Sequence, residues 1–276
     1  MWPFDAAPAH EVLRIGPLAV ERWAGSSAGL SLVNRDVLPA TAWHQPDVLV
    51  DAVRSLYRNQ KGAKVTLVLE SGWLPLLLAD AGTGIWNQAQ IEALLRHRLS
   101  LLYDDAVHSV SSWDLRVAYR PGERFALGYG LSPPVRQALM AGGESAGLQW
   151  AAMVPALDWG WQRLRPSRHW PHGNGWWLWP EQDRMLVAWF SRGQMAGLNA
   201  GASLAAEPLA IEALVDVESL RLGVEAQTAP IDAAAWAEPP QTSGAAGRLT
   251  WNTLCAKGAA SAAAAGRTRQ ASGVPV

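Results

Sequence analysis

The chain has little cysteine and little charge. Its 276 residues include one cysteine, Cys255, which excludes a disulfide framework and a zinc site built from several cysteines, and which is typical of a reducing compartment. Charged residues make up 17% of the chain, with 23 Lys and Arg against 24 Asp and Glu. Nucleic-acid-binding domains usually have a basic face, so we expect no nucleic-acid partner. A surface with so few charges suits a protein that is covered within an assembly.

Long apolar runs are also missing. No uninterrupted run reaches the ~18 residues that a membrane-spanning helix needs. The nearest candidate, Val65 to Ala79, is interrupted by Glu70, Gly72 and Pro75. The first five residues, Met1 to Asp5, lack the basic and apolar segments of a secretory signal. We therefore expect no direct membrane insertion, and any role at a membrane would depend on a partner.

The aromatic residues are unusually distributed, with 16 Trp but only 3 Phe and 4 Tyr. Tryptophan combines a large apolar area with one N–H donor and is enriched at interfaces. Trp176, Trp177 and Trp179 lie in one predicted strand, where alternate side chains point to opposite faces. Trp177 and Trp179 should share a face and Trp176 should take the other. At least one of them must therefore lie on a sheet face that a helix or a partner covers.

Two parts of the chain have the same layout. Residues 175–201 contain three short apolar runs separated by polar turns, the first turn being Glu181-Gln182-Asp183-Arg184. Near the N-terminus, the run Leu18–Trp23 is followed by a turn at Gly25–Gly29 and a second run at Leu30–Val33. Alternating runs bounded by turn residues indicate β-hairpins. Each copy precedes a segment of helical periodicity, so the sequence predicts a duplicated α/β fold with a cleft between two halves.

Between the two copies, the pattern predicts a compact α+β insert. Helical periodicity at Pro46–Tyr57 and a buried strand at Lys64–Glu70 precede it. The insert itself begins with an amphipathic helix capped by Asn87 and continues as strand, strand, helix from Pro134, and strand. From about Glu238 the chain is rich in Ala, Gly, Pro and Ser, too poor in apolar surface to offset the entropy of ordering. The predicted divisions are 1–85 for the first half, 86–154 for the insert, 155–237 for the second half and 238–276 for a disordered tail.

Two motifs could indicate catalysis. Gly25–Gly29 and Gly143–Gly147 both match G-x-S-x-G, and Ser145 of the second is followed by Asp158 and His169 in a workable order. A nucleophile elbow needs a strand before the serine and a helix after it. The first match is a hairpin turn, and the second follows a helix and precedes a strand. A serine hydrolase that uses Ser145 is therefore a disfavoured alternative.

A metal site has even less support in the sequence. His169 and His172 form an H-x-x-H pair in a predicted loop, but no third ligand lies near them in the sequence. We expect no catalytic residue and no metal.

Three segments resemble one known family. They are Glu123–Gly130 (ERFALGYG), the helix from Pro134, and Ala146-Gly147-Leu148 followed by Val154-Pro155-Ala156-Leu157. Together they are similar to the actin-like PilM family, which includes pilus-biogenesis proteins and the cytoplasmic part of the type II secretion L protein. The resemblance covers roughly Leu13 to Thr228. It implies a duplicated RNase H-like (actin-like ATPase) fold with a small α+β insert.

The same resemblance implies a function and a place in the cell. Proteins of this kind are cytoplasmic scaffolds, peripheral to the inner membrane, in type IV pilus biogenesis or type II secretion. They bind the cytoplasmic segment of a single-pass inner-membrane platform protein, and the resemblance also admits an assembly ATPase as a partner.

The hairpins depart from those of ATP-binding proteins with this fold, which place an acidic residue and glycines around phosphate and magnesium. Leu13–Pro17 contains no Asp, and Gly175–Pro180 is a bulky apolar run. Glycine permits close backbone approach to phosphate, whereas tryptophan blocks it. We therefore expect a degenerate, non-catalytic member without a cofactor, a pseudo-ATPase. The alternative is a divergent ATPase or kinase that still binds Mg·ATP.

The expected partner surface is the seam between the insert and the first half. Trp73, Trp86 and Trp113 flank this seam in the sequence. Buried aromatic side chains dominate the energy of many interfaces, so these three are the predicted partner-binding residues. The alternative is that they belong to the hydrophobic core.

Overall fold

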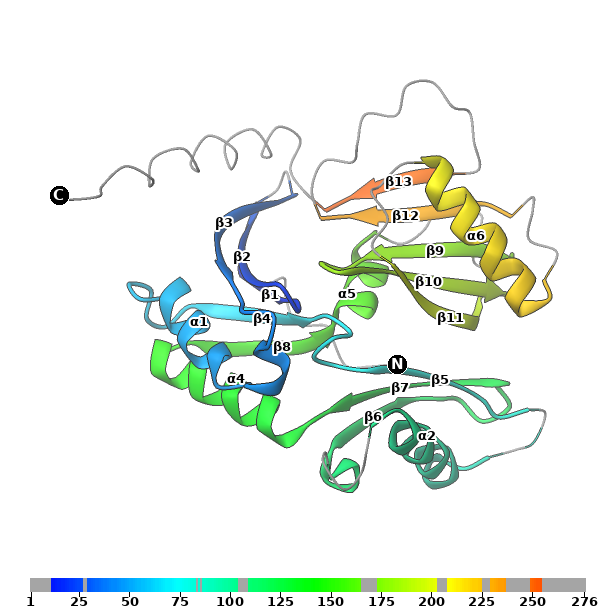
Figure 1. Cartoon of the computed structure of the whole chain (residues 1–276), viewed down its shortest axis with the longest axis horizontal. Helices are drawn as coiled ribbons and strands as arrows, with labels where there is room; N and C mark the ends of the chain where they lie inside the picture. Colours follow the sequence, from blue (N-terminus) through cyan, green and yellow to red (C-terminus); the bar gives the residue numbers. More distant parts are fainter. Residues whose placement is uncertain are drawn as a thin grey trace.

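The computed structural model describes residues 11–26, 29–82, 84, 86–103, 109–164, 173–202, 208–224, 229–236 and 249–254. Two five-stranded mixed sheets and a three-stranded antiparallel sheet form its framework (Figure 1). The first sheet has the order β3-β2-β1-β4-β8 and the second has the order β11-β10-β9-β12-β13. In both, a meander of three antiparallel strands is followed by two parallel ones. The predicted duplication of an α/β unit is confirmed.

The strands have these bounds: β1 Glu11–Ile15, β2 Ala19–Ser26, β3 Gly29–Val37, β4 Lys64–Leu69, β5 Leu76–Asp80, β6 Asp114–Ala118, β7 Phe125–Leu131, β8 Gln149–Pro155, β9 Gly175–Pro180, β10 Arg184–Ser191, β11 Gln194–Ala202, β12 Ile231–Ala235 and β13 Leu249–Thr253. The helices are α1 Val48–Leu56, α2 Gln88–Leu102, α4 Pro133–Ala146, α5 Ala156–Leu164 and α6 Pro208–Leu222, with short 3₁₀ turns at Ala42–His44 and Val110–Ser112.

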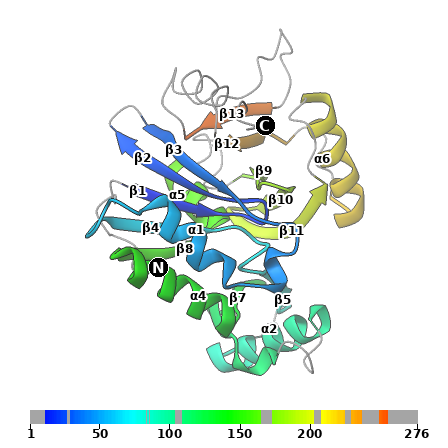
Figure 2. The same cartoon turned by 60° about the vertical axis from the view of Figure 1, so that its left-hand side comes forward.

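The helices lie in layers around the two large sheets. Helices α1 and α4 cover the outer face of the first sheet, α6 covers the outer face of the second, and α5 lies between the sheets (Figures 1 and 2). Three clusters of buried side chains fill the spaces between these layers. Because both faces of each sheet are covered, the central strands are apolar on both sides.

Strand β9 illustrates this covering of both faces. Trp177 and Trp179 belong to the cluster between the two sheets, whereas Trp176 belongs to the cluster under α6. All three side chains have no solvent-exposed area. The predicted division of the tryptophans between two faces is confirmed, and helices of the same chain cover both.

The predicted helices also form. Helix α1 occupies the segment predicted as Pro46–Tyr57. Helix α2 begins after Asn87, whose side chain accepts a hydrogen bond from the Gln90 backbone N–H while the Gln90 side chain accepts one from the Asn87 N–H. This reciprocal capping box satisfies two donors at the helix start that have no partner within the helix.

Strand pairing differs from the predicted insert boundaries of 86–154. Strand β5 precedes residue 86 but pairs with β7 in the small sheet. Strand β8 lies within the predicted insert but pairs with β4, and α4 packs with α1 on the first sheet. The small sheet and α2 therefore comprise residues 76–131, and residues 133–155 return to the first half. Alternation of apolar and polar residues predicts that a segment is a strand, but the sheet that the strand joins depends on residues far away in the chain.

Strand β13 lies within the tail predicted as disordered over 238–276, and the residues of that tail other than 249–254 lie outside the described part of the chain. Residues 249–253 pair in parallel with β12, placing Trp251 opposite Ala233. Trp251 packs against the cluster under α6, and Leu254 is buried between the two sheets. The Leu254 carbonyl accepts a hydrogen bond of 2.9 Å from the Leu30 N–H of β3. Trp251 and Leu254 thus contact the chain's own two halves.

In the described part of the chain, no helix combines the length and the apolarity that crossing a bilayer requires.

Candidate functional site

The first hairpins of the two halves meet directly. The turn between β9 and β10 inserts Gln182 into the turn between β1 and β2. The Gln182 Oε1 accepts hydrogen bonds from the Leu18 N–H at 3.0 Å and the Ala19 N–H at 2.7 Å, and its Nε2 donates to the Ala19 carbonyl at 3.0 Å. Phosphate oxygens bind to backbone N–H groups of this kind. In this chain a neutral side chain of the other half already occupies those donors.

Gly16 leaves the space that Gln182 fills. A Cβ at this position would lie 2.3 Å from the Gln182 Cδ and 2.4 Å from the Glu70 Oε2. The absence of a side chain therefore lets Gln182, rather than a ligand, approach the backbone closely. Gly16 therefore makes room for the contact between Gln182 of the second half and the first hairpin.

A buried ionic network lies behind this turn. Arg14 of β1 donates from Nε to the Glu70 Oε1 at 2.6 Å and forms an ion pair with Glu21 at 3.1 Å. The Gln182 backbone N–H donates to the Glu70 Oε2 at 2.9 Å, which joins the network to the second half. Glu70 has no exposed area. Buried charges are costly unless paired and hydrogen-bonded, and this carboxylate has both kinds of partner.

Glu181 makes the reciprocal contact from the second half. Its Oε1 accepts a hydrogen bond of 2.7 Å from the Ser71 N–H, and its Oε2 contacts the Ser71 hydroxyl. Burial, and then the negative charge of Glu70, raise the pKa of Glu181 to about 7. Burial also raises the pKa of Glu70, against the opposing effect of Arg14. Two carboxyl groups from different halves therefore share one buried environment.

Deeper between the sheets, aromatic rings fill the space. Trp236 follows β12 and is 5% exposed. Its ring stacks on Trp159 of α5 at 4.9 Å and lies 5.5 Å from Trp23 of β2 and 5.6 Å from Trp179 of β9. The Arg14 guanidinium lies 4.4 Å from the same ring. Because Trp236 contacts side chains of both halves, the interior of the cleft is packed as a hydrophobic core.

The residues of the serine hydrolase alternative do not form its site. Ser145 lies in the last turn of α4, exposed, and its hydroxyl donates to the Gly142 carbonyl at 2.9 Å. The preceding segment is a helix and the following one is strand β8, so no strand–turn–helix elbow exists there. Asp158 accepts a hydrogen bond from the Tyr129 hydroxyl, and burial raises its pKa to about 6. His169 lies outside the described residues.

Metal ligands do not gather in the described residues, where no three His, Cys, Asp or Glu side chains form a group that could hold a metal ion. His172, the second histidine of the H-x-x-H pair, lies outside those residues, as His169 does.

An open groove does exist at the predicted seam between the first half and the small sheet. Its volume is about 340 Å³, and it extends from Gly72 and Trp73, after β4, to Trp113, before β6, and the start of α4. The lining contains no acidic, Lys or Arg side chain. Sequence reasoning missed Pro46, Tyr103 and Val135, which also line it. The sequence does not distinguish these residues from core residues, because an apolar side chain can lie either in a groove or in the core.

The structure brings together two of the three predicted partner-binding tryptophans. Trp73 is 3% exposed, and its indole N–H donates to the Gly16 carbonyl at 2.9 Å. Trp113 is 6% exposed, and its ring lies 5.0 Å from that of Tyr103. Both form fixed walls of the groove. Trp86 is half-buried against the core of the small sheet and does not line the groove.

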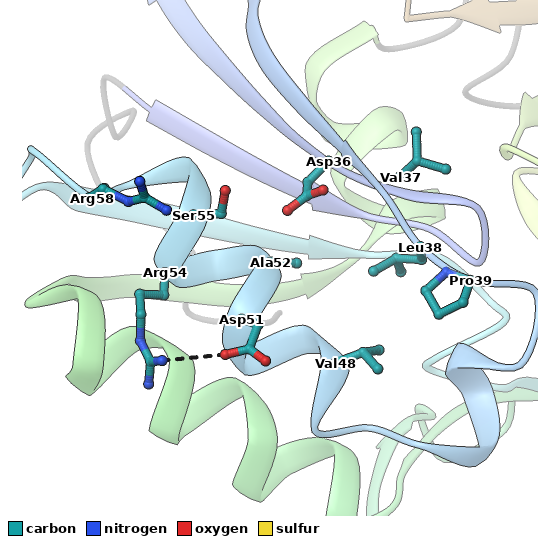
Figure 3. A pocket seen from close by; sticks show the side chains of 10 residues that line it. All are labelled: Asp36, Val37, Leu38, Pro39, Val48, Asp51, Ala52, Arg54, Ser55 and Arg58. Carbon is teal, nitrogen blue, oxygen red and sulfur yellow. Dashed lines mark hydrogen bonds and ion pairs between the residues drawn. The ribbon is translucent and has the colours of Figure 1, made fainter. Parts of the chain in front are cut away.

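A second groove of about 420 Å³ lies between the end of β3 and α1 (Figure 3). Asp36 and Val37 approach it from the strand, Asp51 and Ser55 approach it from the helix, and Arg58 follows the helix. Its lining contains acidic and arginine side chains, whereas the described lining of the first groove has His44 but no acidic, Lys or Arg side chain, which makes the second groove a suitable control surface.

Comparisons with known proteins concern the fold. No family model matches the sequence, and no curated protein matches it. A chain of the PilM–PilN type IV pilus biogenesis complex is 13% identical over 86% of this chain and 83% of that chain, with a TM-score of 0.55. The cytoplasmic domain of EpsL, an inner-membrane component of the type II secretion system of Vibrio cholerae, is 16% identical over 87% of both chains, with a TM-score of 0.49.

A Bacteroides thetaiotaomicron protein with an actin-like ATPase fold and unknown function is 8% identical over 86% of both chains, also with a TM-score of 0.49. At these identities, structural likeness concerns the fold alone. Together with the two mixed five-stranded sheets and the small antiparallel sheet, the likeness to the PilM–PilN complex shows that this chain has an actin-like α/β fold.

Proposed function

We propose that this protein is a non-catalytic scaffold of a type IV pilus- or type II secretion-like inner-membrane platform. In this role it binds the cytoplasmic segment of a membrane partner and lies in the cytoplasm, at the membrane through that partner. One pair of observations carries the proposal: side chains of the chain itself fill the cleft between the halves, and the described residues form a separate groove of about 340 Å³ beside the small sheet.

The packed cleft supports a scaffold without ATPase activity. A nucleotide between the halves would have to displace Gln182 from the Leu18 and Ala19 N–H groups. It would also have to displace Trp236 from its stack on Trp159. Each displacement exposes buried groups whose contacts the ligand would have to replace. The chain thus uses its cleft to hold the two halves together.

The groove supports the binding of an uncharged, extended segment. Its walls are the rings of Trp73, Tyr103 and Trp113, and prolines flank them. Rigid aromatic walls bury apolar or proline-rich segments at little entropic cost. The fold likeness to the PilM–PilN complex supports the same choice of partner, since that complex joins PilM to a second pilus-biogenesis protein.

The substitution Ser132→Trp should block this groove. Ser132 lines it at the N-cap of α4 and makes no side-chain capping bond, so the helix does not depend on this side chain. The probe is a fluorescent, uncharged, proline-rich peptide, the kind of extended segment that an aromatic-lined groove binds. Fluorescence polarisation should show binding to the wild type and at least a tenfold weaker affinity for the variant, equivalent to about 1.4 kcal/mol.

The matched control is Ser55→Trp, the same substitution in the second groove (Figure 3). Ser55 is exposed on α1, and its variant should bind the peptide as tightly as the wild type. Absence of binding to the wild type, or equal affinity for the wild type and Ser132→Trp, would contradict the proposal.

A further inference from the structure

The polar contacts between the two hairpins form a distinct unit. From the second half, Glu181 and Gln182 reach across to the first half. From the first half, Ser71 binds Glu181, and Leu18 and Ala19 bind Gln182. These five residues are named the clasp. Both halves contribute hydrogen-bond donors and acceptors to it, so the clasp forms only when the halves are together.

The charges around Glu181 are unbalanced. Glu70 faces it from the end of β4, and its charge adds to the burial of Glu181. Arg14 lies on Glu70, with its Nε 2.6 Å from the Glu70 Oε1, and Glu21 lies beyond Arg14. The cation nearest to Glu181 is Arg184 of β10, whose Nε lies 4.0 Å from the Glu181 Oε2 and which also pairs with Asp183 at 2.6 Å. The Arg14 charge thus stabilises an ionised Glu70, whereas Glu181 shares its nearest cation, Arg184, with Asp183.

We propose that the clasp is proton-linked: it holds the two halves together when Glu181 is protonated and loosens when Glu181 ionises. Protonated Glu181 is uncharged beside Glu70 and keeps an oxygen that accepts from the Ser71 N–H. Ionised Glu181 places a second buried negative charge beside Glu70. Separation of the hairpins would expose Glu181 to water and remove that cost. This device goes beyond the proposed scaffold role and does not depend on it.

The direction of the pH effect follows from proton linkage. In the closed clasp the pKa of Glu181 is about 7, above its ordinary value of 4.5. The closed form therefore retains a proton that the open, solvated form releases between these two pH values. The clasp is most stable below pH 4.5, weakens as the pH rises to about 7, and changes little above that. Opening should be at least about tenfold more favourable at pH 8 than at pH 5.

Hydrogen exchange of the Leu18 and Ala19 amides in the full chain measures this opening directly, because both amides donate to Gln182. After correction for intrinsic exchange rates, their protection in the wild type should fall by at least about tenfold between pH 5 and pH 8. In Glu181→Gln, whose side chain stays neutral, the fall should be clearly smaller, and any remaining fall reports Glu70, whose pKa burial also raises. Constant protection in the wild type, or an equal fall in Glu181→Gln, would overturn the proposal.

Asp51→Asn is the control. Asp51 is an exposed carboxylate of α1 outside the clasp, and it pairs with Arg54 at 3.3 Å. The same neutral substitution should keep the pH dependence of the wild type. A loss of that dependence in Asp51→Asn would show that carboxylates outside the clasp control exchange, and would overturn the role of Glu181. The wild-type pH series needs no substitution, so it tests the proposal even where a variant folds poorly.

Discussion

Gly160→Ala should unfold at a much lower denaturant concentration than the wild type. Gly160 lies in α5 between the two sheets, where a Cβ would stand 1.8 Å from the Trp179 Cζ3 and 2.4 Å from two other atoms of that ring. The ring is rigid and fully buried, so α5 or β9 would have to move. Overpacking of a core costs about 1–3 kcal/mol and sometimes more. We expect a loss of about 3 kcal/mol in chemical denaturation.

Gly72→Ala provides the control for Gly160→Ala. A Cβ on Gly72 would meet Pro17 at 3.5 Å, an ordinary van der Waals distance. The added methyl group also restricts the unfolded chain, so the free energy of unfolding should stay within about 1 kcal/mol of the wild-type value. If Gly160→Ala were as stable as Gly72→Ala, the close packing of α5 on β9 would be contradicted.

Trp236→Ala should cause a loss of similar or greater size. Truncation of a buried tryptophan typically costs about 3–5 kcal/mol, because the lost burial adds to the cost of the cavity. Here the cavity would open between the halves and would also leave Arg14 without the ring 4.4 Å away. Calorimetric or denaturant unfolding measures the loss.

Trp236→Phe is the conservative comparison, since a smaller ring can still stack on Trp159. It should retain more than half of the stability that Trp236→Ala loses, because the phenyl ring preserves most of the buried area. If the alanine variant lost less than about 1 kcal/mol, Trp236 could not be the packed centre of the interface between the halves.

Much of the fold could be predicted from local sequence. Alternation around Trp176, Trp177 and Trp179 gave the correct faces of β9, and Asn87 gave the start of α2. These features depend on residues close together in the chain. The sheet to which β5 and β8 belong could not be predicted in the same way, because pairing with β7 and β4 depends on distant residues.

The site was predictable only in part. Of the tryptophans predicted to flank the seam, Trp73 and Trp113 line one groove there, and their binding of a partner stays a prediction. By contrast, Glu181 and Gln182 have the sequence features of an ordinary polar turn. Only the three-dimensional fold places Glu181 beside Glu70, 111 positions earlier in the chain. Burial of a polar turn by a distant segment leaves no local pattern.

The contacts at the clasp and around Trp236 join the two halves through the chain's own side chains. Proteins that close two halves around a nucleotide depend on that ligand for contacts across the cleft. In this chain Gln182 occupies backbone donors of the other half, and Trp236 joins the two sheets. The contacts between the two halves are therefore made by side chains of the chain itself.

Thermal unfolding with and without millimolar Mg·ATP tests this account most directly. A ligand that binds only the native state raises its apparent stability, by ~2.7 kcal/mol at one hundred times its dissociation constant. Because the chain's own side chains fill the cleft, we expect cooperative unfolding at the same temperature under both conditions. A clear rise of the unfolding temperature with Mg·ATP would contradict the account, since it would mean that the halves admit a nucleotide between them.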